Sequence, residues 1–272
     1  MAPNGIVTLT TDFGLDDSYV AELHAVLLAS TPRLTVVDLS HSVPPGDLDS
    51  TLYLTERAWP AFPIGTVHMV VVDPGVGGER RLVAVESAGS FYVGPDTGVL
   101  SNALPEIMRS REGSSRRALP AAVRAVEISG SPSRQQPVST TFQGRDVMAP
   151  VAAAIATGSA LEETGDTLTE LRLAPPIQAI VRDGLGKGRI IHIDHFGNAV
   201  TNFRTRDAGP AFRIEVGNIH ALGPAASYLA GTPDTPIAIG GSGGYIEVAW
   251  PSGDAAGRLG LRRGDPARIR PA

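Results

Sequence analysis

The sequence contains no cysteine among its 272 residues. This absence excludes disulfide bonds, thiolate metal ligands and a cysteine nucleophile, and it is typical of proteins from a reducing compartment. The N-terminus has no charged stretch followed by an apolar run, and no apolar run approaches the roughly 18 residues that a membrane span requires. We therefore expect a cytoplasmic protein that does not associate with a membrane.

Positive charge is also scarce. Lys and Arg number 23 against 28 Asp and Glu, which gives a formal net charge of −5, and no basic stripe with interleaved aromatic residues occurs. This pattern argues against a nucleic-acid partner. The hydrophobic content of 42% is ordinary for a globular chain of this length, which can bury one large core or two smaller ones.

The most informative segment is residues 67–86, VHMVVVDPGVGGERRLVAVE. Its first six residues are apolar on both faces, which predicts a buried parallel strand. A glycine-rich turn follows and leads directly into a second predicted strand, so the turn lacks the helix that a dinucleotide-binding fingerprint requires. The turn places Asp73 and Arg80 at the carboxyl end of a strand, where ligands bind in open α/β sheets. By spacing alone, a structural ion pair is the commoner explanation of such a pair.

Residues 1–175 alternate between predicted strands and helices. Apolar runs at residues 6–10 and 34–37 precede segments in which apolar residues have helical spacing. Asp47 is positioned to cap the second of these helices. Strand, helix and strand in this order predict βαβ units, and therefore an N-terminal α/β domain with a mostly parallel sheet.

Beyond residue 175 helical spacing is nearly absent, and Pro175-Pro176 together with a glycine-rich segment at residues 184–188 are typical of a domain boundary. Short strands are predicted at residues 189–193, 199–203, 212–216, 237–239, 245–249 and 267–269. We expect a smaller all-β domain, a barrel or a sandwich, over residues 183–272.

Acidic residues gather after the first predicted strand, at Asp12, Asp16 and Asp17. An aspartate just beyond a strand end can bind both hydroxyls of a ribose diol, and further acids favour a cationic ligand. Helix capping is the alternative for Asp16 and Asp17. The six histidines show no metal-ligand or triad spacing, so we expect no metal site.

Two further clusters can carry chemistry. Residues 142–146, FQGRD, precede a helix predicted over roughly 147–157, where free N–H groups can hold an anion or a water molecule. Residues 194–202, DHFGNAVTN, contain Asn198, whose amide can recognise the edge of a base, and Asp194, which can hold an ammonium group. The alternative explanation of this segment is a β-turn with Asx bonding.

Five motifs in one order resemble those of the S-adenosyl-L-methionine (SAM) hydroxide adenosyltransferases, relatives of the SAM-dependent fluorinases and chlorinases. They are TTDFG (10–14), DPGVGGERR (73–81), TFQGRD (141–146), DHFGNAVTN (194–202) and SGGYIEVA (242–249). The resemblance implies an N-terminal α/β domain, a C-terminal β-barrel domain and a homotrimer whose active sites lie between subunits. It also implies hydrolysis of SAM to adenosine and L-methionine, with SAM as substrate and with neither a cofactor nor a metal.

The resemblance also implies roles for individual residues. Asp73, Arg80 and Gln143 occupy the catalytic positions. Seven residues occupy substrate-binding positions: Asp12 for the ribose diol, Asp16 and Asp194 for the ammonium group, Asn198 and Tyr228 for adenine, Ser242 for the methionine carboxylate and Phe142 beside the reacting carbon.

Gln143 departs from the family pattern, in which a histidine is usual. Glutamine can orient a water molecule but cannot accept its proton at neutral pH, so we expect a slower enzyme than a relative with the histidine. Two alternatives remain. A SAM-dependent halogenase carries Tyr in place of Asp73 and Thr in place of Val76, and a fluorinase carries Ser in place of Gly144. A non-catalytic SAM or adenosine binder is the second alternative.

Overall fold

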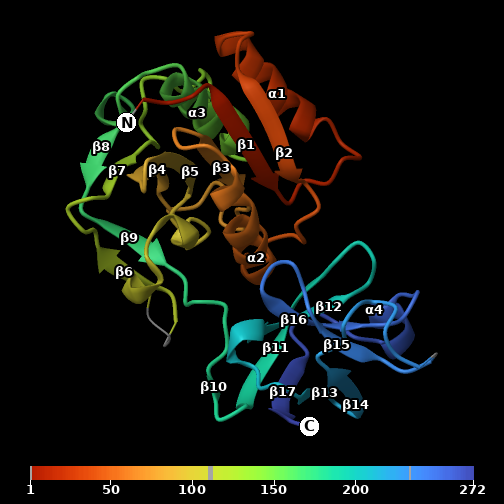
Figure 1. Cartoon of the computed structure of the whole chain (residues 1–272). Coiled ribbons are helices and arrows are strands. Elements are labelled where there is room, and N and C mark those ends of the chain that lie inside the picture. The colour runs from red at the N-terminus through yellow and green to blue at the C-terminus, as the bar shows by residue number, and fades with distance from the viewer. Residues whose placement is uncertain (1, 110–112, 233) are drawn as a thin grey trace. The chain divides into compact units, whose positions relative to one another are not determined.

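The computed structural model describes residues 2–109, 113–232 and 234–272 (Figure 1). The chain divides into two compact units, Met1–Pro176 and Ile177–Ala272. None of the helices in the described ranges is both long enough and apolar enough to cross a bilayer.

The N-terminal unit is built on a seven-stranded sheet with the strand order β2-β1-β3-β5-β4-β7-β8. Its strands are β1 (Ile6–Thr11), β2 (Thr35–Ser40), β3 (Val67–Val71), β4 (Leu82–Ser87), β5 (Ser90–Pro95), β7 (Arg124–Glu127) and β8 (Asp166–Leu168). The pairs β1–β2, β1–β3 and β3–β5 are parallel, and the three strands beyond β5 are antiparallel. This confirms the predicted α/β class with a mostly parallel sheet.

Both faces of this sheet are buried. On β3, Met69 and Val71 belong to one hydrophobic cluster, whereas Val70 and the following Val72, just beyond the strand, belong to the other. The first cluster includes residues of α1 (Tyr19–Ser30) and α3 (Ala149–Ala156), and the second is flanked by α2 (Leu48–Ala58). Because neighbouring residues of a strand point to opposite faces, a strand covered on both sides is mostly apolar, and in β3 the one polar residue is the buried His68.

Shorter elements complete this unit. A two-stranded sheet joins β6 (Ser115–Ala118) to β9 (Glu170–Leu173), and a π-helical turn, η4 (Gly144–Met148), leads into α3. The helix predicted from about residue 147 therefore begins as a π-helix three residues earlier. The short 3-10 segments of the chain are Trp59–Ala61, Ser101–Ala103, Glu106–Met108, Leu161–Glu163 and Thr205–Asp207.

The C-terminal unit is a closed barrel of seven strands in the order β11-β12-β16-β15-β14-β13-β17, with β17 pairing back onto β11. The strands are β11 (Leu185–Ile193), β12 (Ala199–Arg204), β13 (Phe212–Val216), β14 (Ile219–Gly223), β15 (Ile237–Gly240), β16 (Tyr245–Ala249) and β17 (Pro266–Pro271). β10 (Val181–Arg182) extends β11 as a hairpin, and α4 (Ala255–Leu259) is a single short helix. The predicted barrel is confirmed.

Most of the glycine-rich segment at residues 184–188 belongs to β11, and Gly184 lies in the turn that joins β10 to β11. Gly186 and Gly188 lie on β11, and a Cβ atom on Gly188 would come within 2.1 Å of Asn202 Oδ1 and 2.9 Å of the Phe203 ring. These glycines therefore permit close packing inside the barrel, and they do not act as a flexible linker.

Candidate active site

The carboxyl ends of β1 and β3 bring two of the predicted acids together. Thr11 pairs with Val71 in the parallel ladder, so Asp12 and Asp73 lie one and two residues beyond the ends of adjacent strands. Asp12 Oδ2 accepts a hydrogen bond of 2.8 Å from the Gly46 N–H. Burial raises the pKa of Asp12, backbone hydrogen bonds partly oppose this change, and the negative charge of Asp73 raises the pKa further.

Asp73 and Arg80 form a buried ion pair across the glycine turn. Arg80 Nε lies 3.0 Å from Oδ1 and 2.9 Å from Oδ2, and Nη2 also donates to Oδ2. The side chains are only 5% and 10% exposed. Gly77 has a φ of +79°, and a Cβ there would lie 2.8 Å from the Thr140 carbonyl oxygen, so this position requires glycine. The turn thus holds a fixed carboxylate–guanidinium pair at the strand end.

Phe142 and Gln143 lie beside this strand end. The Phe142 ring packs edge-on against Phe13, with 5.7 Å between centroids, and against Tyr19, with 5.3 Å. Arg145 stacks over Phe142 and binds Glu22 at 2.7 Å, which attaches the segment to α1. Phe142 is therefore adjacent to the residue that follows Asp12.

The Gln143 side chain has an unused acceptor. Its Oε1 is buried and meets no hydrogen-bond donor among the described residues. An unsatisfied buried acceptor costs about 1–3 kcal/mol, so its position favours a polar ligand or water molecule as the missing partner.

The remaining acids at the start of α1 are exposed. Asp16 and Asp17 both face solvent, and the N-cap position of α1 is Ser18, whose Oγ donates to Glu22 Oε1 at 2.7 Å. The carboxylate of Asp16 is thus accessible to a ligand.

In the C-terminal unit, Asp194 and Asn198 close the turn between β11 and β12. Asp194 Oδ1 accepts from the N–H groups of Phe196 at 2.9 Å and Asn198 at 2.8 Å, and Oδ2 accepts from Asn198 Nδ2 at 2.9 Å. The β-turn with Asx bonding is therefore present. It orients the buried Asn198 amide so that its nitrogen faces Asp194.

A second polar group in the same unit surrounds Glu247 on β16. Tyr228 donates a 2.7 Å hydrogen bond from its hydroxyl to Glu247 Oε2, and the ring is 42% exposed. Gly241 lies against the same carboxylate, because a Cβ there would fall 1.8 Å from Oε1, and the exposed Ser242 follows it. The sequence analysis missed Glu247, although an acid between apolar residues of a buried strand is itself a signal, since buried carboxylates need partners.

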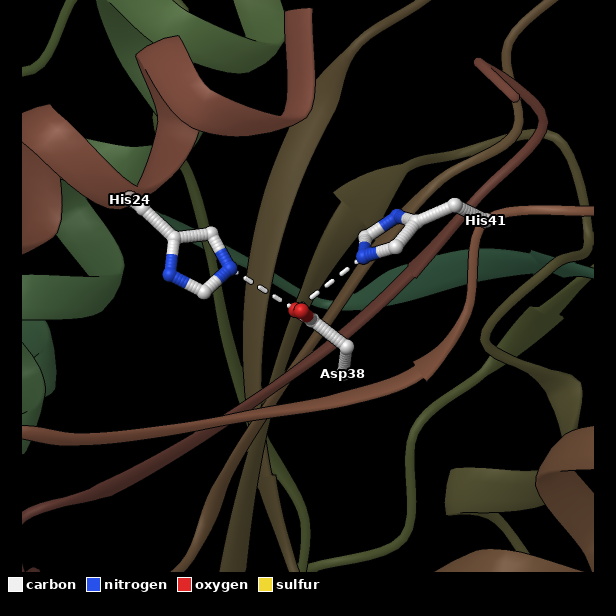
Figure 2. Close-up of side chains that lie close together, drawn as sticks. All are labelled: His24, Asp38 and His41. Atoms are coloured by element: carbon white, nitrogen blue, oxygen red, sulfur yellow. Dashed lines mark hydrogen bonds and ion pairs between the residues drawn. The ribbon is translucent and has the colours of Figure 1, made fainter. Parts of the chain in front are cut away.

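The structure also assembles a group that sequence spacing did not reveal. His24, Asp38 and His41 converge at the end of β2 and the adjacent α1, with both imidazoles directed at one carboxylate oxygen (Figure 2). Their separation along the chain does not follow a metal-ligand pattern, because a helix and a strand bring them together.

These features define a class of two-domain protein: an α/β unit with an acid–arginine pair at its strand ends, followed by a closed barrel with a polar turn. The family model for the SAM hydroxide adenosyltransferase N-terminal domain matches residues 7–165, and the model for the C-terminal domain of the same family matches residues 188–268. The chain belongs to the SAM hydroxide adenosyltransferase family.

Relatives with known names agree with this assignment. The chain is 35% identical over 278 residues to an (R)-S-adenosyl-L-methionine hydrolase of Salinispora tropica, covering 99% of each chain. It is 36% identical to the protein of the same name from Thermus thermophilus, covering 97% of this chain and 98% of the relative. A fluorinase of an Actinoplanes species is more distant, at 28% identity over 75% of this chain and 73% of the relative.

A solved structure supports the fold over the full length. The crystal structure of an uncharacterized conserved protein from Thermotoga maritima superposes with a TM-score of 0.83 at 28% identity, covering 97% of this chain and 99% of that one.

Proposed function

We propose that this protein hydrolyses SAM to adenosine and L-methionine. One observation carries the proposal: the buried Asp73–Arg80 pair lies beside Asp12 at the carboxyl ends of adjacent parallel strands, in a chain of the SAM hydroxide adenosyltransferase family. The named relatives at 35% and 36% identity are SAM hydrolases, which supports hydrolysis over halide transfer.

The reaction is a displacement at the ribose C5′. A water oxygen forms a bond to C5′ as the C–S bond breaks, the sulfur leaves with the bonding electrons as the neutral thioether of methionine, and the water proton passes to a base or to solvent. Since the leaving group is already neutral, the enzyme has to hold and orient the water molecule. We assign this work to Asp73, held in place by Arg80, and to the unsatisfied Oε1 of Gln143, which can accept a hydrogen bond from the water.

The proposed substrate contacts follow from the chemistry of SAM, which carries a ribose diol, an adenine, an ammonium and a sulfonium but no phosphate. Asp12 accepts from the diol, and Phe142 lines the reacting carbon. Asn198 donates its Nδ2 to Asp194, so its Oδ1 is the atom left to accept from the adenine amino group. The further proposed contacts are Asp16 and Asp194 with the ammonium group, Tyr228 with the adenine face and Ser242 with the carboxylate.

The family resemblance leads us to propose a homotrimer in which one subunit supplies the N-terminal residues of a site and its neighbour supplies the C-terminal ones. The test is complementation: Asp73→Asn and Asp194→Ala variants are unfolded, refolded as a mixture and assayed at a SAM concentration below the KM, where each variant alone has low activity. Intersubunit sites predict partial recovery of activity, because some sites then contain no substitution. Sites formed within one chain predict no recovery.

The primary test measures adenosine and L-methionine released from SAM by chromatography, for the parent protein and its Gln143→His variant. We expect both products from the parent and a faster reaction from the variant, because a general base contributes ~10²–10⁴-fold. SAM binding without products in both proteins would instead identify a binding protein.

A chloride-containing reaction tests the halogenase alternative. Gly144 opposes the fluorinase form of that alternative, since a Cβ there would lie 2.8 Å from Val71 Cγ1 and the serine of a fluorinase would not fit without a shift. A chlorinated nucleoside formed at the expense of adenosine would overturn the hydrolase assignment.

A further inference from the structure

We propose that His24, Asp38 and His41 form a binding site for one divalent transition-metal ion of the Zn²⁺ type. His24 lies on α1, Asp38 on β2 and His41 directly after β2, and Figure 2 shows both rings turned toward the carboxylate. The proposal concerns binding alone and does not depend on the proposed reaction.

The distances suit such an ion. His24 Nε2 lies 2.8 Å and His41 Nε2 lies 3.0 Å from Asp38 Oδ1, and one ligand atom from each residue falls within 4.8 Å of the other two. Zinc–ligand bonds of about 2.0–2.2 Å in a tetrahedral site place neighbouring ligand atoms roughly 3.3 Å apart. The two carboxylate–imidazole distances therefore need to lengthen by only a few tenths of an ångström to admit the ion, and the two imidazoles already offer ligand atoms within 4.8 Å of each other.

His41 is already held in the manner of a metal ligand. Its side chain is only 4% exposed, and its Nδ1 lies 2.9 Å from Thr11 Oγ1. Metal-bound histidines almost always donate the second ring N–H to an oxygen, and the Thr11 hydroxyl can accept it. The backbone is fixed as well, because the Gly14 N–H donates to the His41 carbonyl at 2.7 Å.

The Nε2 atom of His41 lacks a satisfactory partner within the protein. Although Asp38 Oδ1 is 3.0 Å away, this buried nitrogen makes no hydrogen bond to any residue that the structure describes. A metal ion placed between the three ligands would give it the partner that the carboxylate does not provide.

The charge and the donor atoms favour the same class of ion. The carboxylate of Asp38 supplies one anionic oxygen ligand between the two imidazoles of His24 and His41. Two imidazole nitrogens with one carboxylate suit Zn²⁺, Co²⁺ or Fe²⁺ rather than Ca²⁺ or Mg²⁺, which prefer oxygen ligands. His24 and Asp38 are 30% and 41% exposed, which leaves room for water to complete the coordination.

The test is a Co²⁺ and Zn²⁺ titration of tag-free protein previously treated with a chelator and dialysed. We expect one ion per chain, the visible absorption of four-coordinate Co²⁺ bound to nitrogen and oxygen, and a higher melting temperature with Zn²⁺. His24→Gln and His41→Gln should each weaken binding at least tenfold. His220→Gln is the matched control, because His220 is 56% exposed and lies on the barrel.

Two results would overturn the proposal: no saturable binding by the parent protein at micromolar metal, or equal binding by the parent and His24→Gln. Either would mean that the three residues form a hydrogen-bonded cluster only. If a histidine variant does not fold, as judged by circular dichroism, Asp38→Asn replaces it, since it keeps the side-chain shape and removes the charge. Unchanged metal affinity in that variant would equally contradict the site.

Discussion

The two units hold their aspartates in different ways. In the N-terminal unit, Asp12 accepts from Gly46, 34 residues away, and Asp73 binds Arg80 across a seven-residue turn. In the C-terminal unit, Asp194 makes its three hydrogen bonds to residues no more than four positions along the chain. The first arrangement depends on the sheet that places the strand ends together, whereas the second is largely contained within one turn.

This difference has energetic consequences. When a buried carboxylate is replaced, the cation that it paired with stays buried without a counter-ion. The resulting loss of stability is larger than that from losing hydrogen bonds in a partly solvated turn. The N-terminal acids should therefore be the more sensitive positions, in stability as well as in activity. Four experiments test this difference, from the largest expected effect to the smallest.

Asp73→Asn should reduce SAM hydrolysis by ~10²-fold or more, because it removes the group proposed to orient the water molecule. It should also lower the free energy of unfolding by about 3–5 kcal/mol, because Arg80 would remain buried without its counter-ion. Product chromatography and urea unfolding measure the two effects.

Asp96→Asn is the matched control. The neighbouring Arg81–Asp96 pair is similarly buried, with side chains 17% and 2% exposed, and has no proposed catalytic role. A comparable loss of stability with activity retained is the expected result. Equal loss of activity in both variants would mean that replacing Asp73 lowers activity by destabilising the fold and that Asp73 has no direct part in the reaction.

Acid should destabilise the N-terminal unit through His68. Its ring packs against both Trp59 and Tyr92, which also contact each other, and burial lowers its pKa from 6.5 to about 4. The unfolded chain binds the proton first, so the stabilising contribution is complete above pH 6.5 and disappears as pH falls toward 4, a loss of about 3 kcal/mol.

Urea unfolding at several pH values measures this loss, and His68→Gln should flatten the pH dependence in that range. None of the histidines of the C-terminal unit, at 192, 195 and 220, is fully buried, so we expect the barrel to contribute little. Acid sensitivity that persists in His68→Gln would assign the effect to other groups.

Asp194→Asn should have a moderate effect. Losing the charged acceptors of the β11–β12 turn should reduce stability by about 1–2 kcal/mol. If Asp194 also holds the SAM ammonium group, the KM should rise about tenfold with little change in kcat, which corresponds to about 1.4 kcal/mol. A stability loss equal to that of Asp73→Asn would contradict the contrast between the units.

Replacing the helix caps should have the smallest effects on stability, and these effects should be similar in the two units. Asp47 accepts from the Ser50 N–H at the start of α2, and Asp254 accepts from the Gly257 N–H at the start of α4. Replacing either residue by Ala should cost about 1 kcal/mol. Hydrogen–deuterium exchange should locate each loss in its own helix, and loss of protection throughout the other unit would show that the two units unfold together.

Local signals predicted much of the fold. The apolar run in β3, the Asp47 cap and the strands β13 and β16 match the structure closely, because each depends on periodicity or turn chemistry within a few residues. The π-helical start at Gly144 and the strand β14 were missed, and the glycines of β11 were taken for a boundary. Close packing against residues distant in the sequence decided the cases of Gly144 and the β11 glycines, whereas β14 pairs with the neighbouring β13 across a two-residue turn.

The sequence by itself determined the fold class, the family motifs and the Asp73–Arg80 pair, whose two members lie on one short glycine turn. Only the tertiary structure decided which residues meet across elements: Asp12 beside Asp73, Tyr228 on Glu247, and the convergence of His24, Asp38 and His41. The physical reason is that periodicity and turn propensity are properties of neighbouring residues, whereas such contacts depend on strand register and helix packing, which the buried core sets for the whole chain.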